Sequence, residues 1–438
     1  MPKLNWPQVR DDLLKLAQSL IKINTTNPPG NEMEAVRFIA NFLNHNGLDS
    51  QIWVSAENRG NLYAVLKGNG NKRPVILLSH LDVVPAQESE WEVPPFSGII
   101  KDGYLWGRGA IDMKSLAAIH LITFVLLSKY KKNLSRDVIL LAVADEEAGA
   151  KYGAQWVIEN HPESIAAEYL LTEGGHGQYL KGRPVYSCQT AEKGVFWLKL
   201  KTSGPPGHAS MPHTRNCLLR LNKAITRLLG DEPEIKIIPA MQEYFSRLAG
   251  SFPEEEDFYR HPLAECHKAH LSKLMEEDRS LYAQLHNTIS PTIFTAGTKI
   301  NVIPSYSEAF LDCRLLPGEN PEEFLAALKS KIDDPEIQIE VVENSPASSS
   351  PMETEIFKIL EKNVKKENPE AILVPYLSPG GTDSRFFRRK GLNCYGFEPF
   401  ILGPEEISRM HGVNERISLQ NLEQGMKIFW NLMDEITG

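Results

Sequence analysis

The sequence has few cysteines, no long apolar run and no excess of positive charge, and each absence excludes a class of protein. Its five cysteines are scattered and never form a C-x-x-C pair, so neither a disulfide framework nor a cysteine zinc knuckle is expected. No segment approaches the roughly 20 apolar residues of a membrane span, and residues 1–10 lack the apolar core of a signal peptide. We therefore expect a soluble, cytoplasmic protein with no membrane partner.

Charge and composition narrow the class further. There are 47 Lys and Arg residues against 56 Asp and Glu residues, a formal net charge of -9, so the chain has no overall basic footprint and no nucleic-acid partner is expected. Hydrophobic residues make up 42% and charged residues 24% of the chain, the profile of a globular protein. A length of 438 residues allows two or three domains.

Short apolar runs alternate with helical stretches in the first half of the chain. Runs at 75–78, 138–144 and 169–171 each end in a cluster of polar residues, and a helical pattern at 114–128 separates the first two. This alternation predicts an α/β fold with helices on both faces of the sheet. Ligands of such sheets bind beyond the carboxyl ends of the strands, which is where the polar clusters fall.

A change in the sequence pattern, from continuous apolar runs to alternating apolar and polar residues, also predicts an inserted second domain. We expect residues 1–193 and 346–438 to form the main domain and 194–345 a smaller α+β domain. Residues 231–290, which are charged and partly helical in pattern, are expected to be an insertion within the smaller domain. The small-residue stretch at 344–351 is typical of a linker.

The polar residues best suited to chemistry form a set that zinc accepts. They are His80, Asp112, Glu146, Glu147, Glu173 and His411. Imidazole and carboxylate groups bind zinc at about 2.0 to 2.2 Å, and a bridging carboxylate would create a two-metal hydrolytic site. Each residue alone also has an ordinary explanation, as a helix start, an N-cap or a turn residue. Convergence of several of them on one sheet edge favours the metal site.

Seven motifs then occur in an order that resembles the M20 family of co-catalytic zinc peptidases, which includes acetylornithine deacetylase, succinyl-diaminopimelate desuccinylase, aminoacylase and glutamate carboxypeptidase. The motifs are HLDVVP (80–85), GRGAIDMK (107–114), DEE (145–147), EGG (173–175), GPPGHAS (204–210), PGGTDSRFF (379–387) and HGVNE (411–415). The resemblance spans about residues 60–425. WEVPPFSG (91–98) and SPGGTDSRFF (378–387) look most like the carboxypeptidase S and N-fatty-acyl amino acid hydrolase branch.

The resemblance implies a zinc-peptidase catalytic domain, with a mixed and mainly parallel sheet, and a lid domain of the dimerisation type. It also implies two zinc ions per subunit. Asp112 would bridge them, His80 and Glu173 would complete one metal site, and Glu147 and His411 the other. Cobalt or manganese would substitute for zinc, because site geometry rather than raw affinity sets selectivity.

The resemblance further assigns three residues to catalysis. Asp82 would accept a hydrogen bond from the His80 ring nitrogen that faces away from the metal. Glu146 would be the general base that takes a proton from the attacking water between the metals and passes it to the leaving amine. His208 would reach the active site of a partner subunit and stabilise the oxyanion, a contribution of about 3 to 4 kcal/mol.

Four residues correspond to family positions that hold the free carboxylate of the substrate, namely Asn301, Arg314, Gly380 and Gly381. A guanidinium suits this role because it meets a carboxylate with two parallel hydrogen bonds. Arg314 has an equally weighted alternative as a structural arginine paired to Glu308.

Two departures from the family pattern leave questions open. Met113 follows Asp112 where other members carry Asp, Asn or Gly, so the sequence does not decide whether this peptide is cis, as it is in the family. The insertion at 231–290 either lines the substrate channel or takes the place of a partner subunit, which leaves a homodimer undecided.

Together these observations predict a hydrolase that cleaves an amide bond next to a free carboxylate, in a small peptide or an N-acyl amino acid. The acyl group is not determined, and a dipeptidase remains an alternative to a deacylase. A non-catalytic binding protein on the same fold is the rival from another class. The complete set of ligands argues against that rival, and the absence of nearby cysteines argues against a structural zinc site.

Overall fold

The chain forms two compact units in the computed structural model, which describes residues 4–131 and 133–438. Unit 1 comprises the chain up to Thr190 together with Ser350–Tyr376 and Thr382–Gly438. Unit 2 comprises Ala191–Ser349 and Leu377–Gly381. Each unit has its own hydrophobic core.

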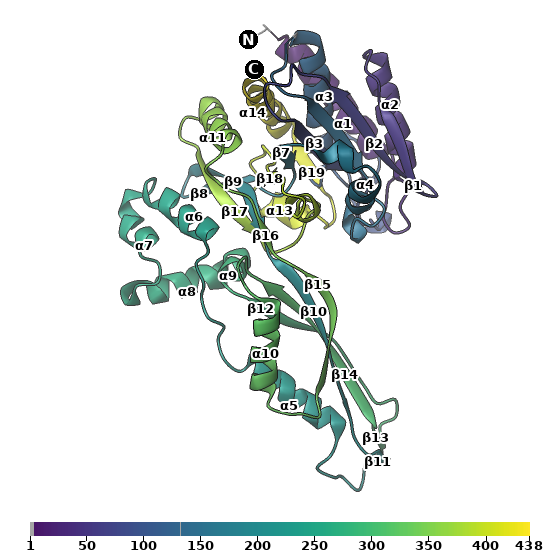
Figure 1. The fold of residues 1–438 in the computed structure, drawn as a ribbon, viewed down its shortest axis with the longest axis vertical. Helices are drawn as coiled ribbons and strands as arrows, with labels where there is room; N and C mark the ends of the chain where they lie inside the picture. Colours follow the sequence, from purple (N-terminus) through teal and green to yellow (C-terminus); the bar gives the residue numbers. More distant parts are fainter. Residues whose placement is uncertain (1–3, 132) are drawn as a thin grey trace. The chain divides into compact units, whose positions relative to one another are not determined.

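The larger sheet has ten strands and four parallel strands at its centre (Figure 1). Its path runs through β1 (Gln51–Ala56), β2 (Arg59–Leu66), β6 (Val138–Val143), β3 (Val75–His80), β7 (Tyr169–Thr172), β18 (Asn393–Gly396), β9 (Arg183–Glu192) and β16 (Ser348–Ser349). Strands β8 (Gly177–Leu180) and β17 (Ile372–Ser378) pair with β9 beside this path. Strands β1 and β2 pair antiparallel at one edge. The predicted α/β fold with a mixed sheet is confirmed.

Helices cover both faces of this sheet because successive strand side chains point to opposite faces. Val75 and Leu77 of β3 belong to one core, and Ile76 and Leu78 to the other. The first core includes α1 (Trp6–Lys22), α2 (Glu32–His45), α3 (Lys114–Tyr130), α11 (Glu355–Glu367) and α14 (Leu419–Ile436). The second includes α4 (Ala154–Asn160) and α12 (Ser384–Arg388). No helix of the described residues combines the length and apolar character that a membrane crossing requires.

Unit 2 contains an antiparallel sheet of four strands with helices on one face. The strand order is β12 (Thr288–Ala296), β14 (Tyr306–Leu315), β10 (Gly194–Ser203) and β15 (Gln338–Ser345). The alternate residues Ala309, Leu311 and Cys313 of β14 are buried, as a half-covered strand requires. They pack with α5 (Cys217–Leu229) and α10 (Pro321–Ile332). A short pair, β11 (Gly207–His208) with β13 (Val302–Ile303), stands apart from this sheet.

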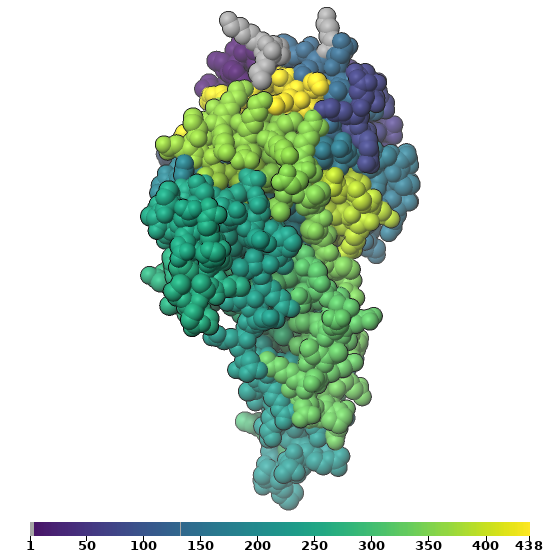
Figure 2. Space-filling model, turned by 60° about the vertical axis from the view of Figure 1, so that its left-hand side comes forward, coloured from purple at the N-terminus to yellow at the C-terminus, as the bar shows by residue number. Residues whose placement is uncertain are grey.

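Within the segment from 231 to 290, residues 239–285 form a group of helices, part of the teal mass in Figure 2, and strand β12 begins at Thr288. The helices are α6 (Pro239–Ala249), α7 (Glu256–Arg260), α8 (Lys268–Glu277) and α9 (Arg279–Leu285). Phe258 of α7 stacks on His270 of α8 with ring centroids 4.2 Å apart.

The stretch at 344–351 differs from the expected linker. Ser348 and Ser349 pair antiparallel with Glu192 and Ala191, so the stretch contributes strand β16. The remaining short elements are β4 (Ile100–Lys101), β5 (Tyr104–Trp106), β19 (Arg416–Ser418) and α13 (Pro404–Arg409).

Candidate metal centre

Three neighbouring parallel strands place polar side chains at one edge of the larger sheet. His80 is the last residue of β3, Glu146 and Glu147 follow β6, and Glu173 follows β7. Strand β3 lies between β6 and β7 and is parallel to both, so the carboxyl ends of the three strands meet. This arrangement brings residues together that are up to 93 positions apart.

The first group of candidate metal ligands consists of His80, Asp112 and Glu173. The His80 Nε2 atom lies 2.9 Å from Asp112 Oδ1 and 3.1 Å from Glu173 Oε2. The Asp112–Met113 peptide that follows is cis, which answers the question left open by the sequence.

The second group consists of Asp112, Glu147 and His411. The His411 Nε2 atom lies 3.0 Å from Asp112 Oδ2 and 3.3 Å from Glu147 Oε1. Asp112 therefore directs one carboxylate oxygen to each group. A carboxylate shared in this way suits two metal ions about 3.5 to 4 Å apart.

The donors of both groups fit zinc in chemistry and spacing. Four donors about 2.0 to 2.1 Å from a tetrahedral zinc ion lie about 3.3 Å from one another, close to the separations found here. The Glu147 Oε1 atom is buried and makes no well-aligned hydrogen bond, although His411 Nε2 lies 3.3 Å away. The His80 Nδ1 atom lies 3.0 Å from the carbonyl oxygen of Asp82, which only accepts, so Nδ1 carries a proton and Nε2 is the nitrogen that remains to bind a metal.

The interaction expected between the His80 ring and the Asp82 carboxylate is not the one found. The ring nitrogen is 3.6 Å from the carboxylate and closer to the main-chain carbonyl of the same residue. The Asp82 carboxylate instead accepts hydrogen bonds from the backbone N–H groups of Glu146 and Glu147, each at 3.1 Å, and from Asn27. Burial alone would raise the pKa of Asp82, but His80 and these donors hold it below its usual value. Asp82 thus holds both the His80 ring and the Glu146–Glu147 turn.

A buried ion pair that the sequence reasoning missed holds two ligand loops together. Glu415 accepts hydrogen bonds from the backbone N–H groups of Ile111 at 2.7 Å and Asp112 at 3.2 Å. Arg108 donates to Glu415 at 2.7 Å and to the carbonyl of Gly412 at 2.8 Å, next to His411. Breaking such a buried pair costs about 3 to 5 kcal/mol. Arg108 and Glu415 belong to two of the recognised motifs, GRGAIDMK and HGVNE, and this was the sign in the sequence from which the pair could have been predicted.

Glu146 lies beside the ligands but belongs to neither group of the described residues. Burial, and next the negative charge of Glu173, raise the pKa of its carboxyl well above the usual value. A carboxylate with a raised pKa accepts a proton more readily near neutral pH.

In unit 2, His208 and Asn301 lie close together. His208 pairs with Val302 in the short β11–β13 ladder, and the carbonyl of Asn301 accepts from Ala209 at 3.1 Å. The backbone N–H of Ser210 donates to His208 Nδ1 at 3.2 Å, which leaves the ring proton on Nε2. His208 is exposed, so this N–H is accessible to an oxyanion.

Arg314 pairs with Asp312 and not with Glu308, the partner in its structural alternative. Its guanidinium binds Asp312 in a fork, at 2.6 and 3.0 Å, whereas Glu308 binds Lys199 at 2.7 Å. Asp312 is two residues from Arg314 on the same face of β14, but Glu308 is six residues away, about 20 Å along a strand.

The glycines of the PGGTDSRFF motif lie near the Arg314 end of the unit 2 sheet. Lys193 donates its backbone N–H to the carbonyl of Ser378, just before Gly380 and Gly381. A Cβ atom at Gly380 would meet only Ser378 Oγ, at 3.7 Å. The turn therefore has room for a ligand to approach its backbone.

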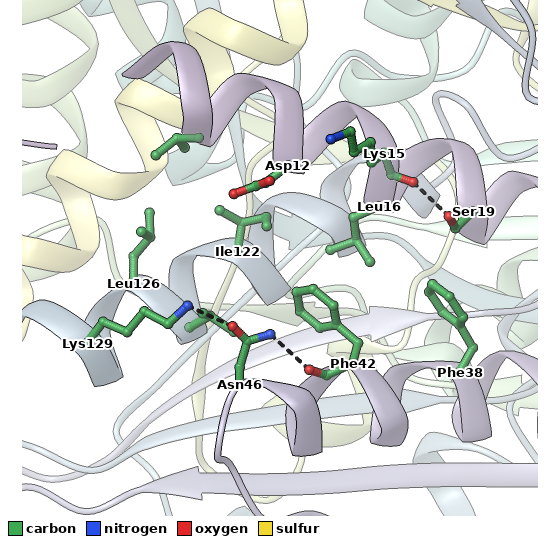
Figure 3. Close-up of a pocket in the computed structure, with 12 residues that line it drawn as sticks. Asp12, Lys15, Leu16, Ser19, Phe38, Phe42, Asn46, Ile122, Leu126 and Lys129 are labelled. Atoms are coloured by element: carbon green, nitrogen blue, oxygen red, sulfur yellow. Dashed lines mark hydrogen bonds between the residues drawn. The ribbon is translucent and has the colours of Figure 1, made fainter. Parts of the chain in front are cut away.

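A pocket of about 370 Å³ in unit 1 is separate from the candidate metal centre. It lies between α1, α2 and α3 (Figure 3), and none of the candidate metal ligands lines it. Lys129 of α3 donates to Asn46 at 2.7 Å, and the Asn46 amide donates to the carbonyl of Phe42 in α2. The polar groups of the pocket thus connect two helices, which is a structural role.

Comparison with known proteins identifies the family of the chain. The model of peptidase family M20/M25/M40 matches residues 76–435. An N-fatty-acyl-amino acid synthase/hydrolase of Mus musculus is 30% identical over 397 residues, which cover 85% of this chain and 76% of the relative. A probable carboxypeptidase S-like protein of Dictyostelium discoideum is 28% identical over 377 residues, which cover 82% of this chain and 71% of the relative. These matches confirm the resemblance indicated by the motifs.

The fold agrees with solved structures as well. An M20 family metallo-carboxypeptidase from Sulfolobus solfataricus has a TM-score of 0.74 and 20% identity, and the match covers 97% of this chain and 98% of that one.

Proposed function

The chain belongs to peptidase family M20/M25/M40, and from this premise we propose that it is a two-zinc hydrolase that cleaves an amide bond next to a free carboxylate. The observation that carries the proposal is the Asp112 carboxylate, whose two oxygens face two different histidines. The names of the two relatives, an N-fatty-acyl-amino acid synthase/hydrolase and a probable carboxypeptidase S-like protein, support amide chemistry on acylated amino acids or C-terminal residues.

The metal sites are assigned as in the two groups described above. One zinc ion would be held by His80, Asp112 and Glu173, and the other by Asp112, Glu147 and His411. Bound zinc would polarise the scissile carbonyl and make water a nucleophile near neutral pH.

Glu146 is the general base of this proposal. Its carboxylate takes a proton from the attacking water and delivers it to the amine that leaves. Its neighbour Glu147 faces the metal, and adjacent residues divide these two roles because their side chains point in different directions. The raised pKa of Glu146 supports the assignment.

Unit 2 supplies the groups that would bind the substrate and its oxyanion. Arg314 and the Gly380–Gly381 turn hold the free carboxylate, with Asp312 orienting the guanidinium. His208 donates from Nε2 to the developing oxyanion, and Asn301 beside it helps to hold the free carboxylate of the substrate.

These two sets of groups lie toward opposite ends of one sheet. Arg314 is opposite Val195 at the start of β10, and Tyr306, near the β11–β13 pair, is opposite Ser203 at its end. Eight residues of strand span about 27 Å, farther than a small substrate extends. Both sets serve one substrate only if they come from two copies of the chain, so the proposal includes a homodimer.

Mixed dimers provide the test of this arrangement. Glu146→Gln and His208→Ala are each expected to be nearly inactive, yet co-expression should restore about a quarter of the parent activity. Half of the dimers that form at random are mixed, and a mixed dimer has both substitutions in one active site and neither in the other. One of its two sites is therefore intact, which gives about a quarter of the parent activity. The measurement is turnover by all of the co-expressed protein, purified through a single tag that both chains carry, with two co-expressed copies of Glu146→Gln as the control. Activity no higher than that of the separate variants would contradict the dimer.

The reaction itself is tested with a panel of dipeptides, N-acetyl amino acids and N-fatty-acyl amino acids. Each substrate is assayed with the protein as purified, after chelation and after zinc is restored. We expect turnover of at least one class that chelation removes and zinc restores; the preferred class then distinguishes a deacylase from a dipeptidase. Zinc binding without turnover of any member would favour the binding protein instead.

The proposal also includes the compartment in which the protein works, the cytosol. All five cysteines are free thiols, four of them buried, which supports a reducing compartment such as the cytosol.

A further inference from the structure

A buried network links the N-terminal segment of unit 1 to the turn that carries Glu146 and Glu147. Its members are Asn27, Glu32, Arg59, Asp82 and Asp145, each at most 6% exposed. Asn27, Glu32 and Arg59 precede residue 76, where the family match begins. None of these three is a ligand or base in the proposed function.

Arg59 is the centre of this network. Its Nη2 atom donates to Asp145 Oδ1 at 2.5 Å, its Nε atom lies 2.8 Å from Glu32 Oε2, and its Nη1 atom donates to the carbonyl of Pro29 at 3.0 Å. A Cβ atom at Gly30 would lie 2.2 Å from the guanidinium carbon, so a residue without a side chain is required where the chain passes Arg59.

Asn27 connects the arginine to the second carboxylate of the network. Its amide donates to Asp82 Oδ2 at 2.8 Å and to Asp145 Oδ1 at 3.0 Å. The backbone N–H of Asn27 donates to the carbonyl of Val83, which fixes the amide beside Asp82. One side chain thus spaces two carboxylates that would otherwise repel each other.

The two carboxylates hold the ligand turn from both sides. Asp82 accepts the N–H groups of Glu146 and Glu147, while Asp145, with a φ of 70°, accepts the N–H of Tyr152 at 3.0 Å. The turn between them places one side chain as the base and the next as a ligand.

We propose that Arg59 and Asn27 are positioning residues that fix the Asp82 and Asp145 carboxylates and thereby set the Glu147 ligand and its metal affinity. The proposal rests on the proposed function in taking Glu147 as a ligand. Glu32 completes the network as the second carboxylate on Arg59, and burial, then the charge of Asp82, raises its pKa to about 7.

The chain offers a matched control in Arg136. It is also fully buried, pairs with two carboxylates, Glu168 and Glu355, and lies over a tyrosine ring at 5.3 Å, much as Arg59 lies over Tyr152 at 5.2 Å. It precedes β6, whereas the ligand turn follows that strand, so the two arginines lie toward opposite ends of β6.

The experiment compares Arg59→Met, Arg59→Lys, Asn27→Ala and Arg136→Met in the full chain. Zinc dissociation constants are measured by competition with a chromophoric chelator, and Tm is measured for the metal-free and zinc-loaded forms. Removing an outer partner of a ligand weakens metal binding by about 10- to 100-fold, so this loss is expected for Arg59→Met and Asn27→Ala. Arg59→Lys should recover part of it, since the charge remains but the fork is lost.

Arg136→Met should lower the metal-free Tm while its zinc affinity stays within about threefold of the parent, because its partners are not connected to a ligand. Parent-like zinc affinity in both Arg59→Met and Asn27→Ala would overturn the proposal, as would an equal loss in Arg136→Met. If Arg59→Met does not fold, Arg59→Lys and Asn27→Ala decide. A parent that binds zinc but hydrolyses nothing overturns only the proposed reaction; a parent that binds no zinc overturns both.

Discussion

Glu146→Gln is expected to keep both zinc ions and to lose turnover by a factor of about 10² to 10⁴, the usual contribution of a general base. The glutamine is nearly isosteric, and Glu146 belongs to neither ligand group, so metal binding has no reason to change. Its amide cannot take a proton from water. The measurements are kcat on the best substrate of the panel and zinc content by elemental analysis.

Glu147→Gln is the matched control for this prediction. It makes the same chemical change one residue later, in a side chain whose Oε1 atom lies 3.3 Å from His411 Nε2. This variant should lose metal from the second group, and its activity should fall together with its zinc content. Normal turnover in Glu146→Gln would show that Glu146 is not the general base. Full zinc content in Glu147→Gln would show that Glu147 is not a metal ligand.

The sequence predicted the centre of the fold because its strands are continuous apolar runs. The runs at 75–78, 138–144 and 169–171 are β3, β6 and β7, buried throughout, and their parallel order brings the following polar residues to one edge. The prediction of a linker at 344–351 was wrong in part, because Ser348 and Ser349 belong to a strand. Strands pair through backbone hydrogen bonds, so the small side chains of this stretch give no sign of the pairing and do not prevent it.

The details of the site depended on contacts between loops, which no local pattern reveals. Asp112 and His411 meet across 299 positions; their residue types placed both in one candidate set, but only the resemblance assigned them to the same metal ion. The Arg108–Glu415 pair spans 307 positions and was missed. The His80 ring nitrogen lies 3.0 Å from the carbonyl of Asp82 and 3.6 Å from its carboxylate, which accepts hydrogen bonds from three other donors; no local pattern predicts so small a difference.

Asp112→Asn is expected to remove both zinc ions, because one side chain serves both groups. Each carboxylate oxygen faces a different histidine nitrogen, at 2.9 and 3.0 Å. An amide turns an NH₂ donor toward one group, where it cannot be a ligand, and offers the other group only a neutral oxygen, which binds zinc more weakly than a carboxylate does. Zinc content should fall from two toward none, and turnover should fall below detection.

Asp137→Asn is the control for this loss. Asp137 pairs with Lys67 at 2.8 Å just before β6, away from the ligand turn, and its variant should keep two zinc ions and full activity. The metal-free Tm of both variants separates a lost ligand from a damaged fold. If Asp112→Asn still binds one zinc ion as tightly as the parent does, the two groups are independent sites, and the shared carboxylate on which the proposed function rests is not a bridge.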